Sequence, residues 1–480
     1  MRGYRDLRHL LQVLRDQGEL HEINVGVDHE WEVGAICREN DDRFGPALMF
    51  NKISTFTTPL VAGIFATLRR YGIALGLPDL DGKEKFDAAA SLWNEAYLNP
   101  VAPRQVSEAP CKEVFIGEDK VNLWSDPFPV PRWHPLDGGY MLGTLHAVIT
   151  KDPDTGWHNC GTYRNQILNE KRLWQSTQKG RHNWIHFEKY RALGKPMPVA
   201  IALGLDPALA VTCVTPVPRD VDEYSVAGGL RGEPLELIRA ETSDLLVPAR
   251  AEIIIEGEIP TNEEDRIPGE GPFGEFAGYQ GFTKGPREYI NIKAITHRRD
   301  PIFQGTLEGR PPNESTVMRG IGRSMALKEH LRRVGVLGII DVCVTMGGAS
   351  QFHAVVAIHK SYPGHVREVM ANVWGHPNMA VKHVVVVDED IDPWNSQKVE
   401  WAIATRVQAG RDVEIVKDGR TVILDPSQPI SKRVWSDLMG IDATRPEREY
   451  EAEGETFPPL ADPTPEQLKK VQNRWKQYGF

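Results

Sequence analysis

Residues 251–257 read Ala-Glu-Ile-Ile-Ile-Glu-Gly, and residues 289–296 read Tyr-Ile-Asn-Ile-Lys-Ala-Ile-Thr. Both runs are rich in isoleucine, a β-branched residue that favours strands. Similar runs occur at 145–150 and 198–204, and several of them alternate between apolar and polar positions and are bounded by glycine or proline. The region from about 140 to 310 therefore predicts a largely antiparallel sheet or barrel.

The connection between the first two runs carries the clearest chemical signal in the chain. Residues 269–281 read Gly-Glu-Gly-Pro-Phe-Gly-Glu-Phe-Ala-Gly-Tyr-Gln-Gly, which places Glu270 and Glu275 five residues apart among five glycines. This spacing matches neither a helix face nor one face of a strand, so the two acids converge only if the backbone turns. Gly271, Pro272 and Gly274 are residue types that allow such a turn. Two carboxylates held close can keep one acid protonated as a donor, although an acidic surface turn is the alternative interpretation.

The composition excludes several classes of function. The net charge of -10 and the sequence pI of about 5.9 predict neither nucleic-acid binding nor attraction to an anionic membrane. The five cysteines contain no Cys-x-x-Cys pair, which argues against a disulfide framework and a thiolate zinc site. The charged N-terminus and the lack of a long apolar run predict no signal peptide and no membrane span. A cytoplasmic enzyme is the expected class.

The remaining sequence predicts about three domains and a tail. Leucines at helical spacing predict an amphipathic helix over residues 4–17, and a further helix is expected near 84–98. After residue 313 helices and strands alternate, which predicts an α/β domain. The predicted units are an N-terminal α/β domain, a sheet-rich middle domain, a C-terminal α/β domain, and a tail whose helix at 466–478 docks on a neighbour. Their predicted bounds are 1–110, 111–313, 314–450 and 451–480.

Three further stretches of the middle region are rich in polar residues, namely 158–164, 179–186 and 216–232. Asn159, His182 and Glu223 would together supply oxygen and nitrogen ligands suited to manganese or magnesium rather than zinc. Such a metal has open positions through which it can bridge to a phosphate. Taken singly, each group has a plain alternative, which is a solvated arginine for Arg164, a polar loop around Arg181, and an ordinary turn after Glu223.

Five motifs in order resemble the UbiD family of reversible decarboxylases, and the resemblance covers essentially the whole chain. They are Asn-x-Gly-x-Tyr-Arg at 159–164, Glu-Tyr-x-x-Ala-Gly-x-Leu-Arg-Gly at 223–232, Glu-Gly-Pro-Phe-Gly-Glu at 270–275, Gly-Arg-Pro-Pro-x-Glu at 309–314 and Met-Gly-Ile-Asp-Ala-Thr at 439–444. The resemblance implies a central split-β-barrel flavin-binding domain flanked by the two α/β domains, with the active site in a cleft between the central and C-terminal domains.

The resemblance also implies a cofactor set. Members of the family use prenylated FMN made by a partner prenyltransferase, and they hold its phosphate through a divalent metal, Mn2+ or Mg2+, with K+ nearby. The matching metal ligands are Asn159, His182 and Glu223. The matching flavin contacts are Thr162, Tyr163, Arg164, Arg181, His182 and Lys382.

The catalytic residues that the resemblance implies are Arg164, Glu270 and Glu275. Arg164 has a planar cation that can pair with Glu270 and lie near the flavin. Glu275, flanked by Phe273 and Phe276, is expected to return a proton to carbon after carbon dioxide leaves. In this interpretation Glu270 is the ion-paired acid and Glu275 the mobile proton donor.

The expected reaction is reversible, non-oxidative decarboxylation of an aromatic or heteroaromatic carboxylic acid, catalysed by a carboxy-lyase. Arg181 and Arg310 depart from the ferulate-type members, and Arg310 is expected to pair with a further anionic or polar substituent of the substrate. A homodimer or a homohexamer is expected, with the C-terminal domain as the main contact. Two alternatives stay open, namely a conventional FMN redox enzyme and an accessory UbiD-like subunit of a carboxylase complex.

Overall fold

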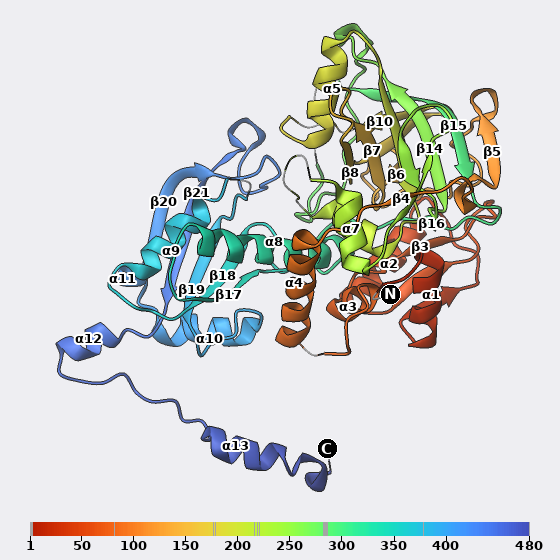
Figure 1. Cartoon of the computed structure of the whole chain (residues 1–480). Helices are drawn as coiled ribbons and strands as arrows, with labels where there is room; N and C mark the ends of the chain where they lie inside the picture. The colour runs from red at the N-terminus through yellow and green to blue at the C-terminus, as the bar shows by residue number, and fades with distance from the viewer. Residues whose placement is uncertain are drawn as a thin grey trace.

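The computed structural model describes residues 3–479 except for positions 81, 176, 178, 216, 218, 220, 282–286 and 378. The described residues form four β-sheets with helices packed around them, so the architecture is mixed α/β and multidomain (Figure 1). An N-terminal α/β part, a middle part with a large sheet and a C-terminal α/β part follow one another along the chain. Within the described residues, every helix is too short or too polar to traverse a lipid bilayer.

The N-terminal part is built around a four-stranded sheet with the order β1-β2-β3-β16. β1 and β2 are parallel, β2 and β3 are antiparallel, and the short β16 returns from the end of the middle region to lie parallel to β3. The strands are β1 (Leu20–Ile23), β2 (Ala47–Phe50), β3 (Leu60–Ala62) and β16 (Phe303–Gln304), and the helices are α1 (Leu7–Asp16), α2 (Glu32–Asp42), α3 (Leu68–Ala74) and α4 (Gly82–Leu98).

The first helix shows how the local sequence specifies this part of the fold. The side chain of Asp6 caps α1 by accepting a hydrogen bond from the backbone N–H of His9 at 3.0 Å. The four leucines at helical spacing are all buried, which confirms the predicted amphipathic helix; they are Leu7, Leu10, Leu11 and Leu14.

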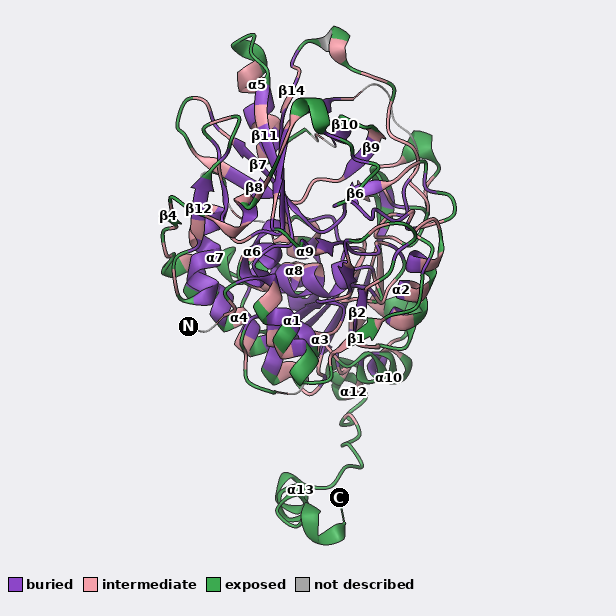
Figure 2. Cartoon of the chain, turned by 90° about the vertical axis from the view of Figure 1, so that its right-hand side faces the viewer, coloured by how far each residue is buried: buried purple, intermediate pink, exposed green. Residues whose placement is uncertain are grey.

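A curled nine-stranded sheet dominates the middle part, and all of its pairings are antiparallel, as the strand patterns predicted (Figures 1 and 2). Its order is β6-β9-β10-β15-β14-β11-β7-β8, with β5 beside β15. The strands are β5 (Val114–Gly117), β6 (Met141–Gly143), β7 (Ala147–Lys151), β8 (His158–Gly161), β9 (Asn165–Asn169), β10 (Arg172–Gln175), β11 (Met197–Leu203), β14 (Ile253–Ile259) and β15 (Tyr289–His297).

A smaller sheet and three helices complete the middle part. The small sheet has the order β13-β12-β4, with β12 antiparallel to β13 and parallel to β4. Its strands are β4 (Arg104–Gln105), β12 (Glu236–Arg239) and β13 (Leu246–Pro248), and the helices are α5 (His182–Ala192), α6 (Pro207–Val214) and α7 (Glu223–Arg231).

The C-terminal part has a five-stranded sheet with the order β17-β18-β19-β21-β20, whose β18, β19 and β21 are parallel. The long helix α8 packs both on β17 and on α4 and α6, so it joins this part to the rest of the molecule (Figure 1). The strands are β17 (Ile339–Val344), β18 (His353–Ile358), β19 (His383–Asp388), β20 (Val413–Arg420) and β21 (Trp435–Ala443), and the helices are α8 (Glu314–Arg333), α9 (His365–Trp374), α10 (Ser396–Arg406) and α11 (Ala409–Asp412).

The tail leaves the body of the molecule and ends in a helix that points into solvent (Figures 1 and 2). It contains α12 (Glu447–Ala452), α13 (Pro465–Gln472) and a short 3-10 turn at Trp475–Tyr478. Large apolar side chains on this helical end are exposed, namely Leu468, Val471, Trp475 and Tyr478. The predicted helix is therefore present, and its docking on a neighbour stays a prediction.

Candidate functional site

The connection from β14 to β15 folds into the turn that carries the two acids. The backbone N–H of Glu275 donates to the carbonyl of Tyr279 at 3.0 Å, and that of Gly281 donates to the carbonyl of Phe273 at 2.6 Å. Residues 273–281 thus double back on themselves, and the backbone turn that the five-residue spacing of the acids required is present.

Gly271 and Gly274 serve close packing, whereas Gly278 at the tip of the turn has a φ of 82°. A Cβ atom on Gly271 would lie 2.3 Å from the Cα of Gly138, and one on Gly274 would lie 2.3 Å from the ring of His134. Neither glycine has a positive φ. The sequence therefore pointed to the right residues. Glycine is needed at positions 271 and 274 because a second segment, residues 134–138, passes close to them, and not because the backbone bends there.

Asp137 anchors the acid turn to that second segment. Its fully buried carboxylate accepts hydrogen bonds from the backbone N–H of Gly274 at 2.9 Å and from the side chain of Gln280 at 3.0 Å. Its other oxygen lies 3.2 Å from Nδ1 of His134. Sequence analysis missed Asp137, although an aspartate before Gly138 and Gly139 in a proline-rich connection is a sequence signal for such an anchor.

Arg164 brings Glu270 and Glu275 together. Its Nε donates to Glu270 Oε2 at 3.1 Å, its Nη2 donates to Glu270 Oε1, and its Nη1 donates to Glu275 Oε1 at 2.9 Å. The guanidinium also lies 4.9 Å from the ring centroid of Phe273. Burial alone would lower the pKa of Arg164, but the charges of Glu275 and Glu270 outweigh it and raise the pKa above its ordinary value. Arg164 is thus a permanent cation shared by two acids.

The two acids are more alike than the sequence-based prediction held. Both are ion-paired to Arg164, and their side chains are 12% and 13% exposed. Ion pairing was expected for Glu270 only. The difference between them lies in their neighbours, because Phe276, next to Glu275, stacks on Phe352 of the C-terminal part at 5.8 Å between ring centroids.

His146 holds the strand-end segment from which Arg164 projects. It is fully buried, and its Nε2 lies 2.9 Å from the carbonyl oxygen of Tyr163, so Nε2 carries the proton and donates. Its own carbonyl accepts a hydrogen bond from the hydroxyl of Thr162 at 2.8 Å. Burial lowers the pKa of His146 to about 4, which keeps the ring neutral at physiological pH. Nothing in the sequence pattern had singled out His146.

The predicted metal ligands lie together at the ends of three elements. Nδ1 of His182 lies 3.7 Å from Oε1 of Glu223, and the hydroxyl of Tyr163 donates to Oδ1 of Asn159 at 3.4 Å. The backbone N–H of Cys160 donates to Oε2 of Glu223 at 3.4 Å. His182 and Glu223 are each the first residue of a helix, α5 and α7, where the helix dipole favours an anion such as a phosphate.

The uncompensated charge of Glu223 fits a divalent cation. Among the described residues, the buried carboxylate of Glu223 has no lysine or arginine partner. Burial raises the pKa of Glu223 despite the hydrogen bond to His182. In the described part of the chain, no three His, Cys, Asp or Glu side chains are placed so that they could hold a metal ion together, and the predicted set has two of these types plus an asparagine.

The other predicted residues lie further out. Arg181 is exposed and precedes α5. The ammonium of Lys382 lies 3.1 Å from Asp425 and donates to Ser427 at 2.6 Å, and no hydrogen bond joins it to the other predicted site residues in the described chain. Arg310 is exposed and ion-paired to Asp42 on α2 at 2.6 Å, and its contact with a substrate stays a prediction. Burial raises the pKa of Tyr163 to about 12, so its hydroxyl stays protonated.

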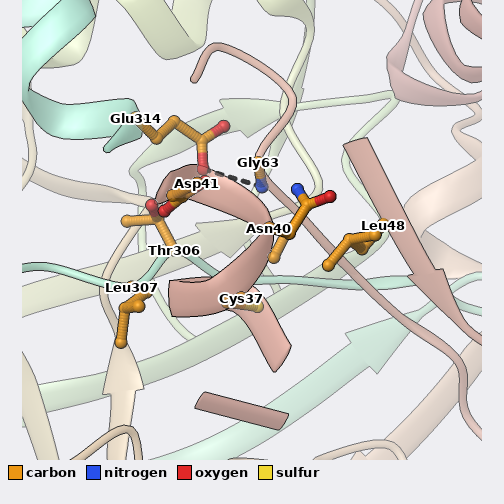
Figure 3. Close-up of a pocket in the computed structure, with 9 residues that line it drawn as sticks. Cys37, Asn40, Asp41, Leu48, Gly63, Thr306, Leu307 and Glu314 are labelled. Atoms are coloured by element: carbon orange, nitrogen blue, oxygen red, sulfur yellow. Dashed lines mark hydrogen bonds between the residues drawn. The ribbon is translucent and has the colours of Figure 1, made fainter. Parts of the chain in front are cut away.

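A small cavity lies elsewhere, between the N-terminal part and the start of α8 (Figure 3). Its volume is about 10 Å³, which is enough for one water molecule and too small for an organic substrate. Its lining includes Asp41 and Glu314, and the Glu314 carboxylate accepts hydrogen bonds from the backbone N–H groups of Gly63 at 3.1 Å and Phe65 at 2.8 Å. The cavity therefore lies beside two buried acids, Asp41 and Glu314, and is not a substrate site.

Family models match three consecutive stretches of the chain. They are the 3-octaprenyl-4-hydroxybenzoate carboxy-lyase N-terminal domain over residues 11–89, the Rift-related domain of the same description over 104–311, and its C-terminal domain over 316–443. A protein of Archaeoglobus fulgidus named only as uncharacterized is 33% identical over 99% of this chain and 98% of its own length.

Two enzymes of known structure are similar over nearly their whole length. The UbiD-class enzyme HmfF from Pelotomaculum thermopropionicum in complex with FMN has a TM-score of 0.86 and 33% identity over 97% of this chain and 99% of its own. An evolved dimeric form of HmfF, in complex with prFMN, has a TM-score of 0.82 and 32% identity over 96% of this chain and 97% of its own. The Sedimentibacter hydroxybenzoicus vanillic acid decarboxylase in open form has a TM-score of 0.86 and 29% identity over 99% and 100%.

Proposed function

The chain belongs to the UbiD family, and from this membership we propose that it catalyses the reversible, non-oxidative decarboxylation of an aromatic or heteroaromatic carboxylic acid. The observation that carries the proposal is the hydrogen-bonded group of Arg164, Glu270 and Glu275. The solved relatives support it, since one is a vanillic acid decarboxylase and another is held with prFMN.

We propose prenylated FMN as the cofactor, supplied by a partner prenyltransferase. Asn159, His182 and Glu223 would hold a divalent metal, Mn2+ or Mg2+, and through it the flavin phosphate, with K+ nearby. Thr162, Tyr163 and Arg181 would contact the flavin. Lys382 would reach the phosphate only after leaving its present partners, Asp425 and Ser427. When bound, this cofactor supplies the electron sink that carbon dioxide loss requires.

The chain's own residues would then orient the acid and move one proton. Arg164 would keep Glu270 in place through two of its N–H groups and Glu275 through a third, so that neither acid drifts from the reacting carbon. Glu275 would deliver the proton to carbon after decarboxylation, because Phe276 and Phe352 form an aromatic wall on its side. Glu275 would be the acid that moves, because one hydrogen bond joins it to Arg164 whereas two hydrogen bonds join Glu270 to Arg164.

The remaining expectations follow from the family. The curled middle sheet would be the split barrel that binds the flavin, and the cleft would lie between it and the C-terminal part. We propose the division of the chain at residues 110, 313 and 450, and a homodimer or homohexamer formed mainly by the C-terminal part. The exposed apolar residues of α13 support docking on a second subunit.

A panel of aryl and heteroaryl acids in heavy water tests the proposal, with protein co-expressed with the prenyltransferase. The expected result is loss of carbon dioxide from at least one acid, deuterium at the vacated carbon, and a released cofactor with the mass of prenylated FMN. Turnover with plain FMN and a nicotinamide cofactor would instead support a redox flavoprotein. Activity that needs a second subunit would support an accessory role.

The Glu275→Gln variant tests the assigned proton donor. Decarboxylation is expected to fall by about 10²–10⁴-fold, the usual contribution of a positioned acid, with the flavin still bound. Glu258→Gln on β14 removes a half-exposed carboxylate that pairs with Lys293 at 3.3 Å, and it serves as the control that leaves activity unchanged. Undiminished decarboxylation by Glu275→Gln with intact prenylated FMN would remove its role.

A further inference from the structure

Glu314, the first residue of α8, anchors that helix to the N-terminal sheet. Its buried carboxylate accepts hydrogen bonds from the backbone N–H groups of Gly63 and Phe65, which follow β3. The hydroxyl of Thr306, which follows β16, also bonds to this carboxylate. Because α8 packs on β17 as well, the Glu314 anchor lies at the start of the helix that joins the C-terminal part to the rest of the molecule.

Asp41 on α2 faces this anchor from across the small cavity. Its side chain is 8% exposed, and Figure 3 shows it beside Thr306 and Glu314. Among the described residues, none forms a hydrogen bond or an ion pair with the Asp41 carboxylate, whereas Asp42 is paired with two arginines. A buried carboxylate without a hydrogen-bond donor is unfavourable, so Asp41 is an exception that needs an explanation.

The charges around Asp41 do not neutralise it. The ionisable groups that face it come from three helices, and they are Cys37, Arg38 and Asp42 on α2, Arg70 on α3 and Glu314 on α8. Arg38 and Arg70 attract a charged Asp41, but each of them already pairs with another acid. Burial, together with the charge of Glu314, raises the pKa of Asp41 to about 7. Burial also holds the pKa of the Cys37 thiol well above its ordinary value, so the thiol stays protonated.

We propose that the acid pair of Asp41 and Glu314 is a proton-controlled contact that determines how firmly the start of α8 is held on the N-terminal part. With a proton, Asp41 can donate a hydrogen bond across the cavity, and the pair carries one negative charge. Without the proton, two negative charges face each other in a space for one water molecule, and their repulsion favours separation of α8 from α2. Since α8 carries the C-terminal part, the position of that part becomes sensitive to pH.

Proton linkage gives the direction and the size of the effect. Asp41 titrates near pH 7 while the contact is closed and near pH 3.8 once water reaches it, so opening releases a proton between these values. The equilibrium constant for opening therefore rises with pH in this window and levels off above pH 7. Between pH 5 and pH 8 the rise is roughly 100-fold for a fully hydrated Asp41.

Hydrogen exchange of the full-length protein at pH 5 and pH 8 measures this opening without a substrate. The reporters are the backbone amides of Gly63 and Phe65, which exchange only when they leave Glu314. After correction for the intrinsic exchange rate, their protection factors should fall by about 10- to 100-fold from pH 5 to pH 8. At pH 8 they should also lie below those of Leu10 and Leu11 on α1, because the contact opens while the N-terminal part stays folded.

Two variants of α2 separate the acid pair from a general effect of pH. Asp41→Asn keeps the shape of the side chain and cannot titrate, so the reporter amides should be equally protected at pH 5 and pH 8. Glu39→Gln removes a charge from the same helix at a site that is 65% exposed, and it should keep the pH dependence of the wild type. If Asp41→Asn fails to fold, the wild-type series still decides, because it requires no substitution.

Alkylation by iodoacetamide at pH 8 alone gives a second measure of opening. Cys37 is buried and lines the cavity, so it reacts only when the contact opens. Peptide masses should show Cys37 reacting roughly 10-fold or more slowly in Asp41→Asn than in the wild type. Cys343, which is buried in the C-terminal part, is the internal reference and should react at the same rate in both proteins.

Three outcomes would overturn the proposal. The first is equal protection of the reporter amides at pH 5 and pH 8 in the wild type. The second is the same pH dependence in Asp41→Asn as in the wild type, which would assign the effect to other groups. The third is equal protection of the reporter amides and the α1 amides at pH 8, because only unfolding of the whole N-terminal part would then release Glu314.

Discussion

Replacing Asp41 by asparagine should stabilise the protein, and more so at alkaline than at acidic pH. Asp41 lines the cavity of Figure 3 and is 8% exposed. Burial, together with the charge of Glu314, raises its pKa from 3.8 to about 7. Asparagine has nearly the same shape and no charge at any pH.

The direction of this pH dependence of stability follows from proton linkage. Since the pKa is higher in the folded than in the unfolded state, the stabilising contribution of protonated Asp41 is complete below pH 3.8 and is lost as the pH rises through about 7. With 1.36 kcal/mol per pKa unit, the wild type loses about 4 kcal/mol over the whole range and roughly 2.5 kcal/mol of it between pH 5 and pH 8. The stability of Asp41→Asn does not fall in this way, because asparagine has no proton to lose in this pH range.

Thermal unfolding at pH 5 and pH 8 measures the difference. As 1 kcal/mol corresponds to about 2–4 °C for a unit of 150–250 residues, the Tm gain of Asp41→Asn over the wild type should be roughly 5 °C or more larger at pH 8 than at pH 5. Equal gains at the two pH values, or a Tm loss that grows toward pH 8, would refute the assigned burial of a charged group.

Asp42→Asn is the matched control at the neighbouring position. Burial raises the pKa of Asp42, but hydrogen bonds from Arg310 and Arg38 outweigh it and leave the pKa below its ordinary value. Its contribution to stability is therefore present above the unfolded pKa and lost only as the pH falls below about 4. Asp42→Asn should lower the Tm by the same amount at pH 5 and pH 8.

Two further predictions concern the candidate site. Arg164→Lys should lower kcat about 10²–10³-fold with the flavin retained, because an ammonium cannot donate in parallel to Glu270 while also holding Glu275, and equal kcat for variant and wild type would count against the geometry. Glu223→Gln should lower the manganese content of the purified protein, measured by elemental analysis, because the amide offers one neutral oxygen in place of a carboxylate, and unchanged metal content would exclude Glu223 as a ligand.

Much of the fold was predictable from local pattern. The leucine spacing of α1, the isoleucine-rich strands β14 and β15, and the alternation that begins at α8 each depend on residues near in sequence, and the structure confirms these elements. The strand β16 was not predictable, because two residues carry no period and their pairing with β3 depends on where the middle sheet returns the chain.

The candidate site divides in the same way. The residue types and motif order pointed to Arg164, Glu270 and Glu275 before any coordinates, because glycine and proline around paired acids predict a turn from local chemistry. The anchor Asp137 and the buried ring of His146 were missed, since their roles come from segments distant in sequence. Arg310 is paired with Asp42 in the structure, and its predicted pairing with a substituent of the substrate stays a prediction.

The sequence alone determined the family, the elements and the residues able to do chemistry, because these are properties of composition, spacing and order. Only the tertiary structure decided which charges are neutralised. It paired Arg164 with both acids and Arg310 with Asp42, and it placed Arg319 and Arg323 on the amide oxygen of Gln351. Electrostatic energy depends on distance through space and on burial, neither of which is written in the order of residues.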